Sequence, residues 1–257
     1  WRDEPAGKQR GSKAFCRELV RYAHDRGVKV VHGFGLNGYD EGQHVCQRVP
    51  EGRAMIPDRL KDTRLGKASL RHVFCPSNAK ALDVLREMLL AAADTGLDGY
   101  NFETADVDYV TCHCEKCAER FQNADEEEYG RKPPRWCTEQ ANWAVELLKR
   151  ERPRLWLSVE FAMQKFGRAP YDNCPGLFLI NKEIDPRATV VWAEGTYPPQ
   201  EICRRLQAER ANVGFYIRGG EMGWARAAEI KPADIVAACR RLATLQPECF
   251  MYRSWMP

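Results

Sequence analysis

The sequence predicts an α/β fold built from repeated strand and helix units. Six short apolar segments alternate with helical segments along the chain, a rhythm that is typical of parallel sheets. Neither a GxGxxG motif nor a phosphate-binding loop follows any of these segments, which counts against a doubly wound nucleotide-binding sheet. With 257 residues and 44% hydrophobic content, the chain is long enough for one domain spanning residues 1–257. We therefore expect a (β/α)8 TIM barrel.

Two strands of such a barrel are missing from the predicted set. A complete barrel has eight strands, and the first helical segment here has no strand before it. We expect the first two strands to lie upstream of Trp1, which makes the last strand of this chain the eighth.

The chain opens with a helical segment at residues 13–26, whose apolar residues recur with a helical period and which Gly27 ends. A buried strand, VKVVHGF, follows at residues 28–34. The next stretch, residues 39–70, is polar and rich in glycine and proline, and we expect a long loop there. A loop of that length in a compact domain is usually functional or disordered.

A second helix, residues 79–95, carries a stripe of leucines, and Asn78 can cap it. It leads into the strand at residues 97–103, where apolar and polar residues alternate. A third helix, residues 138–150, leads into the strand at residues 155–161. The remaining strands are expected at residues 189–194, 213–217 and 249–255, and the helices between them at residues 200–210 and 232–245.

Glutamates stand where these strands end. Glu103, Glu160 and Glu194 close three successive strands, and Glu221 follows the next one. Catalytic residues of TIM barrels lie at the C-terminal ends of the strands, and glycosidic cleavage needs a carboxylic acid and a carboxylate. We therefore predict a hydrolase of glycosidic bonds in a polysaccharide or glycan, with Glu103 as general acid and Glu194 or Glu160 as base or nucleophile. The structural alternative for Glu103 is a buried ion pair with an arginine such as Arg218.

Several other polar and aromatic residues near the strand ends are candidates for substrate binding. Flat rings stack on sugar faces, and amide, imidazole and guanidinium groups bind hydroxyl or carboxylate groups. Each type also has a structural alternative, such as an aromatic ring in the core, a hydrogen-bonded structural histidine, an arginine paired with a glutamate, or a solvated acidic loop. The candidates are His32, Asn37, Asn101, Asp106, Trp192, Arg218, Glu221 and Trp255.

A cysteine cluster follows the strand that ends at Glu103. Cys112, Cys114 and Cys117 place three thiols within six positions, and tetrahedral zinc needs four ligands. Cys137 is the candidate for the fourth ligand, with His113 as the runner-up. Disulfides and free thiols are the alternatives. Because a site this rich in sulfur is usually closed, we expect a structural zinc and no cofactor for catalysis.

The overall composition excludes two classes of partner. The chain has 39 Lys and Arg against 36 Asp and Glu, a net charge of +3 without a long basic block, so we expect no binding of nucleic acid. It has no run of about eighteen apolar residues, so we expect no membrane span. The expected partner is a carbohydrate, and the oligomeric state is left open.

The motifs DGYNFETADVDY, CxCxxC and NKEIDPRATVVWAEG together resemble the TIM-barrel glycoside hydrolases of the α-glucuronidase and β-N-acetylglucosaminidase type, from about Phe15 to Trp255. The resemblance implies an acid glutamate on the fourth strand, which maps onto Glu103, and it favours a secreted or periplasmic location. Many retaining members have an adjacent Asn-Glu or Asp-Glu pair, whereas Phe102 separates Asn101 from Glu103 here. The alternatives are a catalytically inactive carbohydrate-binding barrel and a zinc-centred interaction module.

Overall fold

Six parallel strands form one sheet in the computed structural model, which describes residues 12–103, 111–121, 134–162, 175–194, 200–218 and, except for 238 and 241–242, 236–253. Each strand pairs with the next one in the sequence, so the order is β1-β2-β3-β4-β5-β6. The α/β class with a parallel sheet is therefore confirmed, and β1 and β6 are the two ends of the sheet among the described residues. The strands are β1 (Val31–Gly35), β2 (Gly99–Glu103), β3 (Trp156–Ala162), β4 (Thr189–Glu194), β5 (Val213–Arg218) and β6 (Phe250–Arg253).

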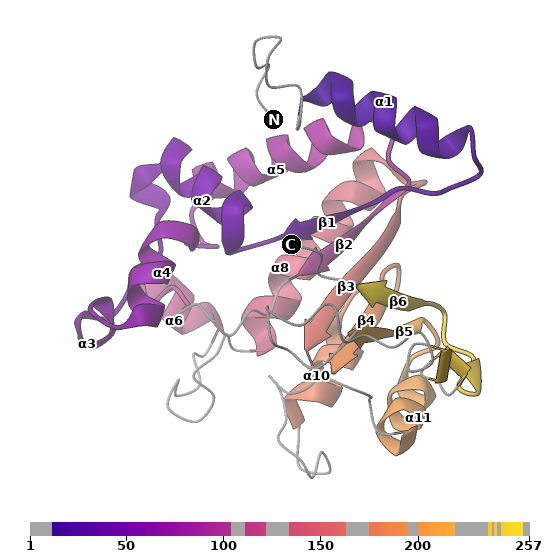
Figure 1. The fold of residues 1–257 in the computed structure, drawn as a ribbon. Helices are drawn as coiled ribbons and strands as arrows, with labels where there is room; N and C mark the ends of the chain where they lie inside the picture. Colours follow the sequence, from indigo (N-terminus) through magenta and orange to yellow (C-terminus); the bar gives the residue numbers. More distant parts are fainter. Residues whose placement is uncertain are drawn as a thin grey trace.

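Each of the six segments predicted as strands overlaps one of these strands, and the bounds at the C-terminal ends differ by at most two residues. The sequential order is that of a singly wound sheet, as in a barrel, whereas a doubly wound sheet changes direction at a switch point. Helix α1 (Lys13–His24) precedes β1. The long helices between successive strands are α5 (Ala79–Ala93), α8 (Pro134–Glu151), α10 (Pro175–Glu183) and α11 (Gln200–Glu209) (Figure 1). The side chain of Asn78 accepts a hydrogen bond from the backbone N–H of Ala81 at 3.1 Å, which confirms the predicted cap of α5.

The stretch predicted as a long loop at residues 39–70 is instead mostly helical. Two of its glycines explain why the composition misled the prediction. A side chain at Gly42 would lie 1.9 Å from the carbonyl oxygen of His72, and one at Gly66 would lie 1.9 Å from that of Leu60. These glycines therefore allow close backbone packing between short helices. The helices are α2 (Tyr39–Arg48), η1 (Pro50–Gly52), α3 (Asp58–Lys61) and α4 (Arg64–His72), and α6 (Glu115–Phe121) lies near them (Figure 1).

The two faces of the sheet differ in chemistry. One face, which we call the helix face, carries Tyr100, whose hydroxyl donates to the carbonyl of Leu89 in α5 at 2.6 Å. Phe102 stacks on Tyr100 with a centroid distance of 5.5 Å. Because side chains alternate along a strand, the residues between these aromatic rings point to the other face, which we call the Glu103 face. Asn101, Glu103, Ser158 and Glu160 lie on that face, opposite one another in the β2–β3 register.

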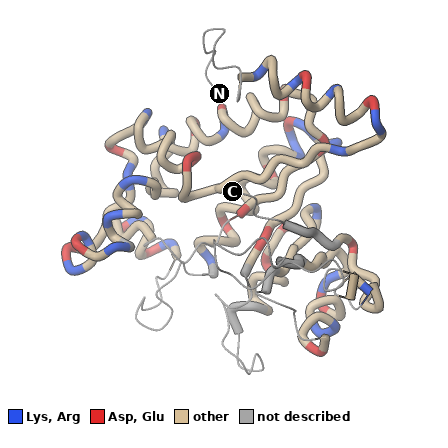
Figure 2. Tube along the Cα trace, viewed as in Figure 1, with Lys and Arg blue, Asp and Glu red and all other residues tan. Residues whose placement is uncertain are grey.

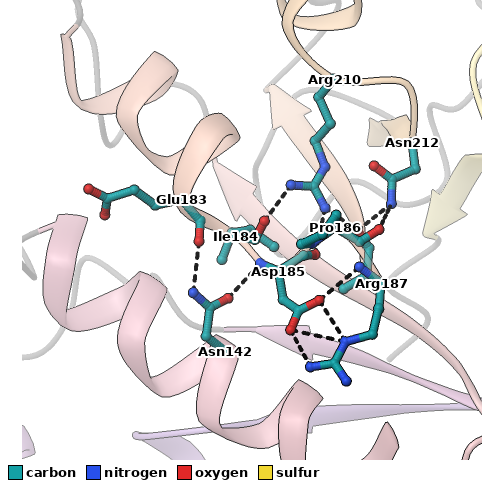
Figure 3. Close-up of polar contacts among 9 residues, drawn as sticks. Asn142, Glu183, Ile184, Asp185, Pro186, Arg187, Arg210 and Asn212 are labelled. Carbon is teal, nitrogen blue, oxygen red and sulfur yellow. Dashed lines mark hydrogen bonds and ion pairs between the residues drawn. The ribbon is translucent and has the colours of Figure 1, made fainter.

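An arginine fastens the N-terminal end of the sheet (Figure 3). The Arg210 guanidinium, just after α11, donates to the carbonyl of Ile184 at 2.6 Å and to that of Asp185 at 2.7 Å. It also donates to the carbonyls of Asn181 and Ala188. The guanidinium therefore contacts four carbonyls at the end of α10 and in the turn between α10 and β4. Burial lowers the pKa of Arg210 to about 10. Its role is to satisfy backbone carbonyls that the turn would otherwise leave without partners.

Asparagine side chains secure the same turn from both sides (Figure 3). Asn142 of α8 donates to the carbonyl of Glu183 at 2.7 Å and accepts from the N–H of Asp185 at 2.7 Å. Asn212 donates to the carbonyls of Pro186 and Ala188 at 2.8 and 2.7 Å. The turn is therefore held by side chains from two separate segments, α8 and the connection between α11 and β5.

Asp98 holds together the N-terminal ends of β1 and β2 by accepting several hydrogen bonds. Its carboxylate, which is 19% exposed, accepts hydrogen bonds from the N–H of Val30 at 2.8 Å, from His24 at 2.7 Å and from Lys29 at 3.0 Å. Partial burial acts to raise the pKa of Asp98, but the hydrogen bonds from Val30, His24 and Lys29 outweigh it and lower the pKa to about 2. At this end of the sheet, the negative charge of Asp98 is therefore paired with His24 and Lys29.

The surface of the described residues carries both signs of charge. Lys and Arg residues are interspersed with Asp and Glu residues along the helices, without a large region of one sign (Figure 2). This mixture agrees with the net charge of +3. Among the described helices, none combines the length and the apolar character that crossing a membrane requires.

Candidate functional site

Glu103 lies at the C-terminal end of β2, between two neighbouring strands. In the register it is opposite Gly35 of β1 and Glu160 of β3. Its backbone carbonyl accepts from the N–H of Leu36 at 3.2 Å, which extends the pairing one residue past β1. Its carboxylate is half-buried and accepts a hydrogen bond from the Tyr39 hydroxyl at 3.1 Å. The predicted general acid is therefore at the sheet edge where a parallel α/β fold places its site.

Glu160 is the second carboxyl group of this face and is only 4% exposed. Asn101 donates to its Oε2 at 2.8 Å, and Ser158 donates to the Oδ1 of Asn101 at 2.7 Å. The chain of hydrogen bonds from Ser158 through Asn101 to Glu160 fixes the direction of the carboxylate. Asn101 was predicted to bind substrate, and in the structure its amide bonds Glu160 and Ser158.

A third carboxyl group, which the sequence analysis missed, comes from α2. The Oε2 of Glu41 would lie 3.2 Å from a β-carbon on Gly35, so this carboxyl group is against the residue that is opposite Glu103 in the register. Burial raises the pKa of Glu41; the backbone N–H groups of Glu41 and Gly35 oppose the shift, and the charges of Asp40 and Glu103 add to it. Acidic residues in the first turn of a helix that follows a strand were the available signal, and the expectation of a loop hid it.

His32 and Trp192 are not on the Glu103 face. The His32 ring contacts Phe34 and Tyr100 edge-on, each at 5.8 Å, and burial lowers its pKa. Trp192 is buried against Phe161 and donates to Asn181 of α10 at 3.4 Å. The prediction considered only how close these residues are to the strand ends. Successive side chains along a strand point to opposite faces of the sheet, so a residue one position away from a site residue faces away from the site. The structure therefore assigns both side chains to packing.

The side chain of Asn37 also forms hydrogen bonds with the backbone of another segment. It is 3% exposed, donates to the carbonyl of Phe74 at 3.0 Å and accepts from the N–H of Phe74 at 3.1 Å. We call this pair of hydrogen bonds the Asn37–Phe74 clasp. The clasp joins the segment after β1 to the segment after α4, which is a structural task and differs from the predicted contact with sugar.

The other predicted residues are described in part or lie outside the described residues. Glu194 and Arg218 end β4 and β5, and Arg218 is opposite Arg253 in the register. Only their backbone positions belong to the described structure. Asp106, Glu221 and Trp255 fall outside the described residues.

Four cysteines come together next to this edge of the sheet. The Sγ atoms of Cys75, Cys112, Cys114 and Cys117 all lie within 4.8 Å of one another. Those of Cys75 and Cys114 are 3.7 Å apart, and those of Cys75 and Cys117 are 3.6 Å apart. A tetrahedral zinc with bonds of about 2.3 Å needs sulfurs about 3.8 Å apart, so the donor set fits this ion. None of the ten described cysteines forms a disulfide.

The fourth member of the group is Cys75, whereas the prediction named Cys137. Cys137 is buried in α8 and does not belong to the group, and neither does His113 among the described residues. Cys75 reaches the cluster because an antiparallel bridge between Arg53 and Phe74 directs its segment there. That contact joins residues far apart in the sequence, so the spacing of the cysteines does not reveal it.

The surroundings of the cluster favour a thiolate. The backbone N–H of Met55 donates to the sulfur of Cys112 at 3.3 Å. Hydrogen bonds from Cys117 and Cys75 lower the pKa of Cys112 to about 4, while the same contacts raise the pKa of Cys75. A lowered pKa at Cys112 favours the thiolate, which is the form of cysteine that binds a metal ion.

No protein-family model and no curated protein matches the chain. Among solved structures, the chain is similar to the glycoside hydrolase domain of PelA from Pseudomonas aeruginosa, with a TM-score of 0.50 and 14% identity over 92% of this chain and 82% of that one. It is also similar to α-amylases from Geobacillus thermoleovorans (TM-score 0.54, 13% identity, 94% and 53% covered) and Anoxybacillus (0.52, 14%, 94% and 52%). The chain spans about half the length of these amylases. At such identities the likeness establishes the fold, and this fold is one that glycoside hydrolases have.

Proposed function

We propose that the protein hydrolyses glycosidic bonds in a polysaccharide or glycan. The observation that carries the proposal is the pair Glu103 and Glu160, which are opposite one another at the C-terminal ends of adjacent parallel strands and lie on the same face of the sheet. One carboxylic acid and one carboxylate at this edge are what glycosidic cleavage requires. The fold shared with glycoside hydrolases supports the same conclusion.

The two residues have distinct roles in the proposal. Glu103 is half-exposed and so can reach a leaving-group oxygen, which suits the general acid. Glu160 is buried and held by Asn101, which suits a carboxylate that faces the sugar ring in one fixed orientation. Glu194, at the end of the next strand, is the alternative partner that the sequence suggested, but it follows Trp192 by two residues and so has the parity of the helix face.

The choice of partner predicts the stereochemistry of the product. Neighbouring strands are about 4.8 Å apart, so the backbone of Glu160 lies about 5 Å from that of Glu103. Val191 is the register partner of Glu160, so Glu194 lies two strands across and three residues further along, about 14 Å from Glu103. Carboxyl groups about 5 Å apart retain the anomeric configuration, and those about 6.5 to 9.5 Å apart invert it. Glu160 as partner therefore predicts retention, and a partner at the longer separation predicts inversion.

The test is hydrolysis of a panel of aryl glycosides, including a glucuronide and an N-acetylglucosaminide. We expect Glu103→Gln to lower kcat by about 10²–10⁴-fold, because general acid catalysis contributes about that much. Glu160→Gln and Glu194→Gln identify the partner, and NMR of the first-formed product gives its anomeric configuration. Sugar release that is unchanged in Glu103→Gln would contradict the proposal, and saturable sugar binding without turnover would indicate a carbohydrate-binding barrel instead.

We also propose that Cys75, Cys112, Cys114 and Cys117 hold a structural zinc. The fit of the sulfur spacing supports this, as does the N–H donor to Cys112. The ion would tie the segment after α4 to the segment before α6 and supplies no group to the reaction.

Metal analysis of the purified protein tests the zinc proposal. We expect one zinc per chain, and a loss of several kcal/mol of stability when the ion is removed by a chelator, because binding of the ion stabilises the folded state. Cys75→Ser should lower the zinc content, and Cys137→Ser, the matched control, should leave it unchanged. Equal zinc content in the two variants would show that the ligand set is wrong.

A further inference from the structure

Tyr39 combines an unusual backbone with a contact to Glu103. Its φ is 52°, in the left-handed region, and Gln246 is the other described residue besides glycine with a positive φ. A side chain with a β-carbon is disfavoured in that region, so the conformation is strained. From this position the Tyr39 hydroxyl donates to Oε1 of Glu103 at 3.1 Å.

Several contacts from the neighbouring segment hold Tyr39 in its strained conformation. The Nδ1 of His72 donates to the carbonyl of Tyr39 at 2.8 Å. The Asn37–Phe74 clasp fixes the chain two residues before Tyr39, and the contact of Gly42 with the His72 carbonyl fixes it three residues after. Contacts on both sides and at the residue itself therefore keep Tyr39 in a conformation that it would leave if unrestrained.

From this geometry we infer that Tyr39 is a positioning residue for Glu103, an inference that rests on the proposed function. Strain of this kind persists where the surrounding structure enforces it, and it concentrates at functional sites. A glycine would adopt the same turn without strain, but it would not carry a phenol to the carboxyl group. The strained backbone thus fixes the orientation of the carboxyl group before substrate binds.

The inference predicts a change in kinetics when the hydroxyl alone is removed. We expect Tyr39→Phe to lower kcat by about 10- to 100-fold with little change in KM, because a misplacement of about 1 Å costs that order of rate. A hydrogen bond donated to a carboxylate stabilises its ionised form, so losing the donor should move the basic limb of the pH–rate profile to higher pH. A kcat and a pH profile equal to those of the wild type would overturn the inference.

Two tyrosines provide matched controls. Tyr22→Phe changes an exposed residue of α1 and should leave kcat, the pH profile and the melting temperature unchanged. Tyr100→Phe removes a buried hydroxyl that donates to Leu89, so it should lower the melting temperature without moving the pH profile. If Tyr39→Phe behaves like Tyr100→Phe, the role of Tyr39 is structural and the inference fails.

A spectroscopic measurement keeps the inference testable if no glycoside is hydrolysed. Titration of phenol absorbance near 295 nm, taken as wild type minus Tyr39→Phe, reports ionisation of Tyr39 alone. We expect this difference titration to move to lower pH in a Glu103→Gln background, because a neighbouring anion disfavours the phenolate. An unchanged difference titration would show that the two groups do not interact. Lack of turnover with a shifted titration would count against the proposed hydrolase and leave the contact established.

Discussion

The two ends of the same sheet are built from opposite electrostatic arrangements. At the N-terminal end, Asp98 accepts from a histidine, a lysine and a backbone N–H, and Arg210 donates to four backbone carbonyls. At the C-terminal end, Glu103 is next to Glu160 in the register and adds to the pKa shift of Glu41. The first end gathers complementary partners, and the second gathers carboxyl groups.

The difference separates stability from chemistry within one set of strands. Complementary contacts lower the free energy of the folded state, whereas adjacent carboxyl groups raise it. An arrangement that raises the free energy of the fold is expected where function requires it. Substitutions at the N-terminal end should therefore lower stability, and substitutions at the C-terminal end should lower activity.

The largest expected effect on stability is at Arg210. Arg210→Ala removes the donor for the carbonyls of Ile184 and Asp185 in a partly buried turn. We expect a loss of about 3 kcal/mol in the free energy of unfolding, because buried carbonyls are left without partners. Urea denaturation measures it, with the exposed Arg204→Ala of α11 as the control. A loss as small as that of the control would mean that the turn is held without this guanidinium.

A smaller effect is expected at Asp98, and it depends on pH. The pKa of Asp98 is lowered to about 2, so its contribution to stability is present above pH 4 and is lost as the pH falls through about 2. We expect that contribution to be on the order of 1 kcal/mol, since the partners His24 and Lys29 are 39% and 79% exposed and are screened by solvent.

Asp98→Asn should therefore be less stable than the wild type at pH 6 and should approach it at pH 2. Denaturation at several pH values compares the two proteins, with the exposed Asp83→Asn of α5 as the control. A difference that stays constant over this range would mean that the ionisation of Asp98 does not contribute.

The smallest effect is expected at Glu41, and it has the opposite sign. Burial raises the pKa of Glu41, so its ionisation disfavours the folded state, and stability should fall as the pH rises above the usual range of a glutamate. Glu41→Gln should therefore be at least as stable as the wild type at pH 7 and should lack this pH dependence. Calorimetry at pH 4 to 7 measures it, with the exposed Glu18→Gln of α1 as the control. A clear loss of stability would show that Glu41 stabilises the fold, contrary to the expected difference between the two ends of the sheet.

The sequence was sufficient for the features that depend on local pattern. The alternation of apolar segments with helices predicted the parallel sheet, and the glutamates at strand ends predicted the edge where Glu103 and Glu160 lie. The sequence also contains the alternation of side chains along each strand, which the prediction did not use, and the structure places His32 and Trp192 on the helix face.

The features that depend on contacts between residues far apart in the sequence could not be predicted from local pattern. Cys75 joins the cysteine group through a bridge between Arg53 and Phe74, which no local spacing encodes. Tyr39 and Glu41 were missed because glycines that serve close packing, such as Gly42, were interpreted as signs of a loop. Composition alone does not distinguish a glycine needed for backbone approach from a glycine of a loop.

The Asn37–Phe74 clasp has a consequence for how this site can vary among related proteins. It joins two residues 37 positions apart in the sequence, so the excursion through α2, α3 and α4 leaves the sheet and returns to the same place. An excursion with its ends fastened together can lengthen, shorten or be exchanged as a cassette while the strands keep their path. Under the proposed function, sugar preference would diversify in this cassette while Glu103 and Glu160 remain on the common framework.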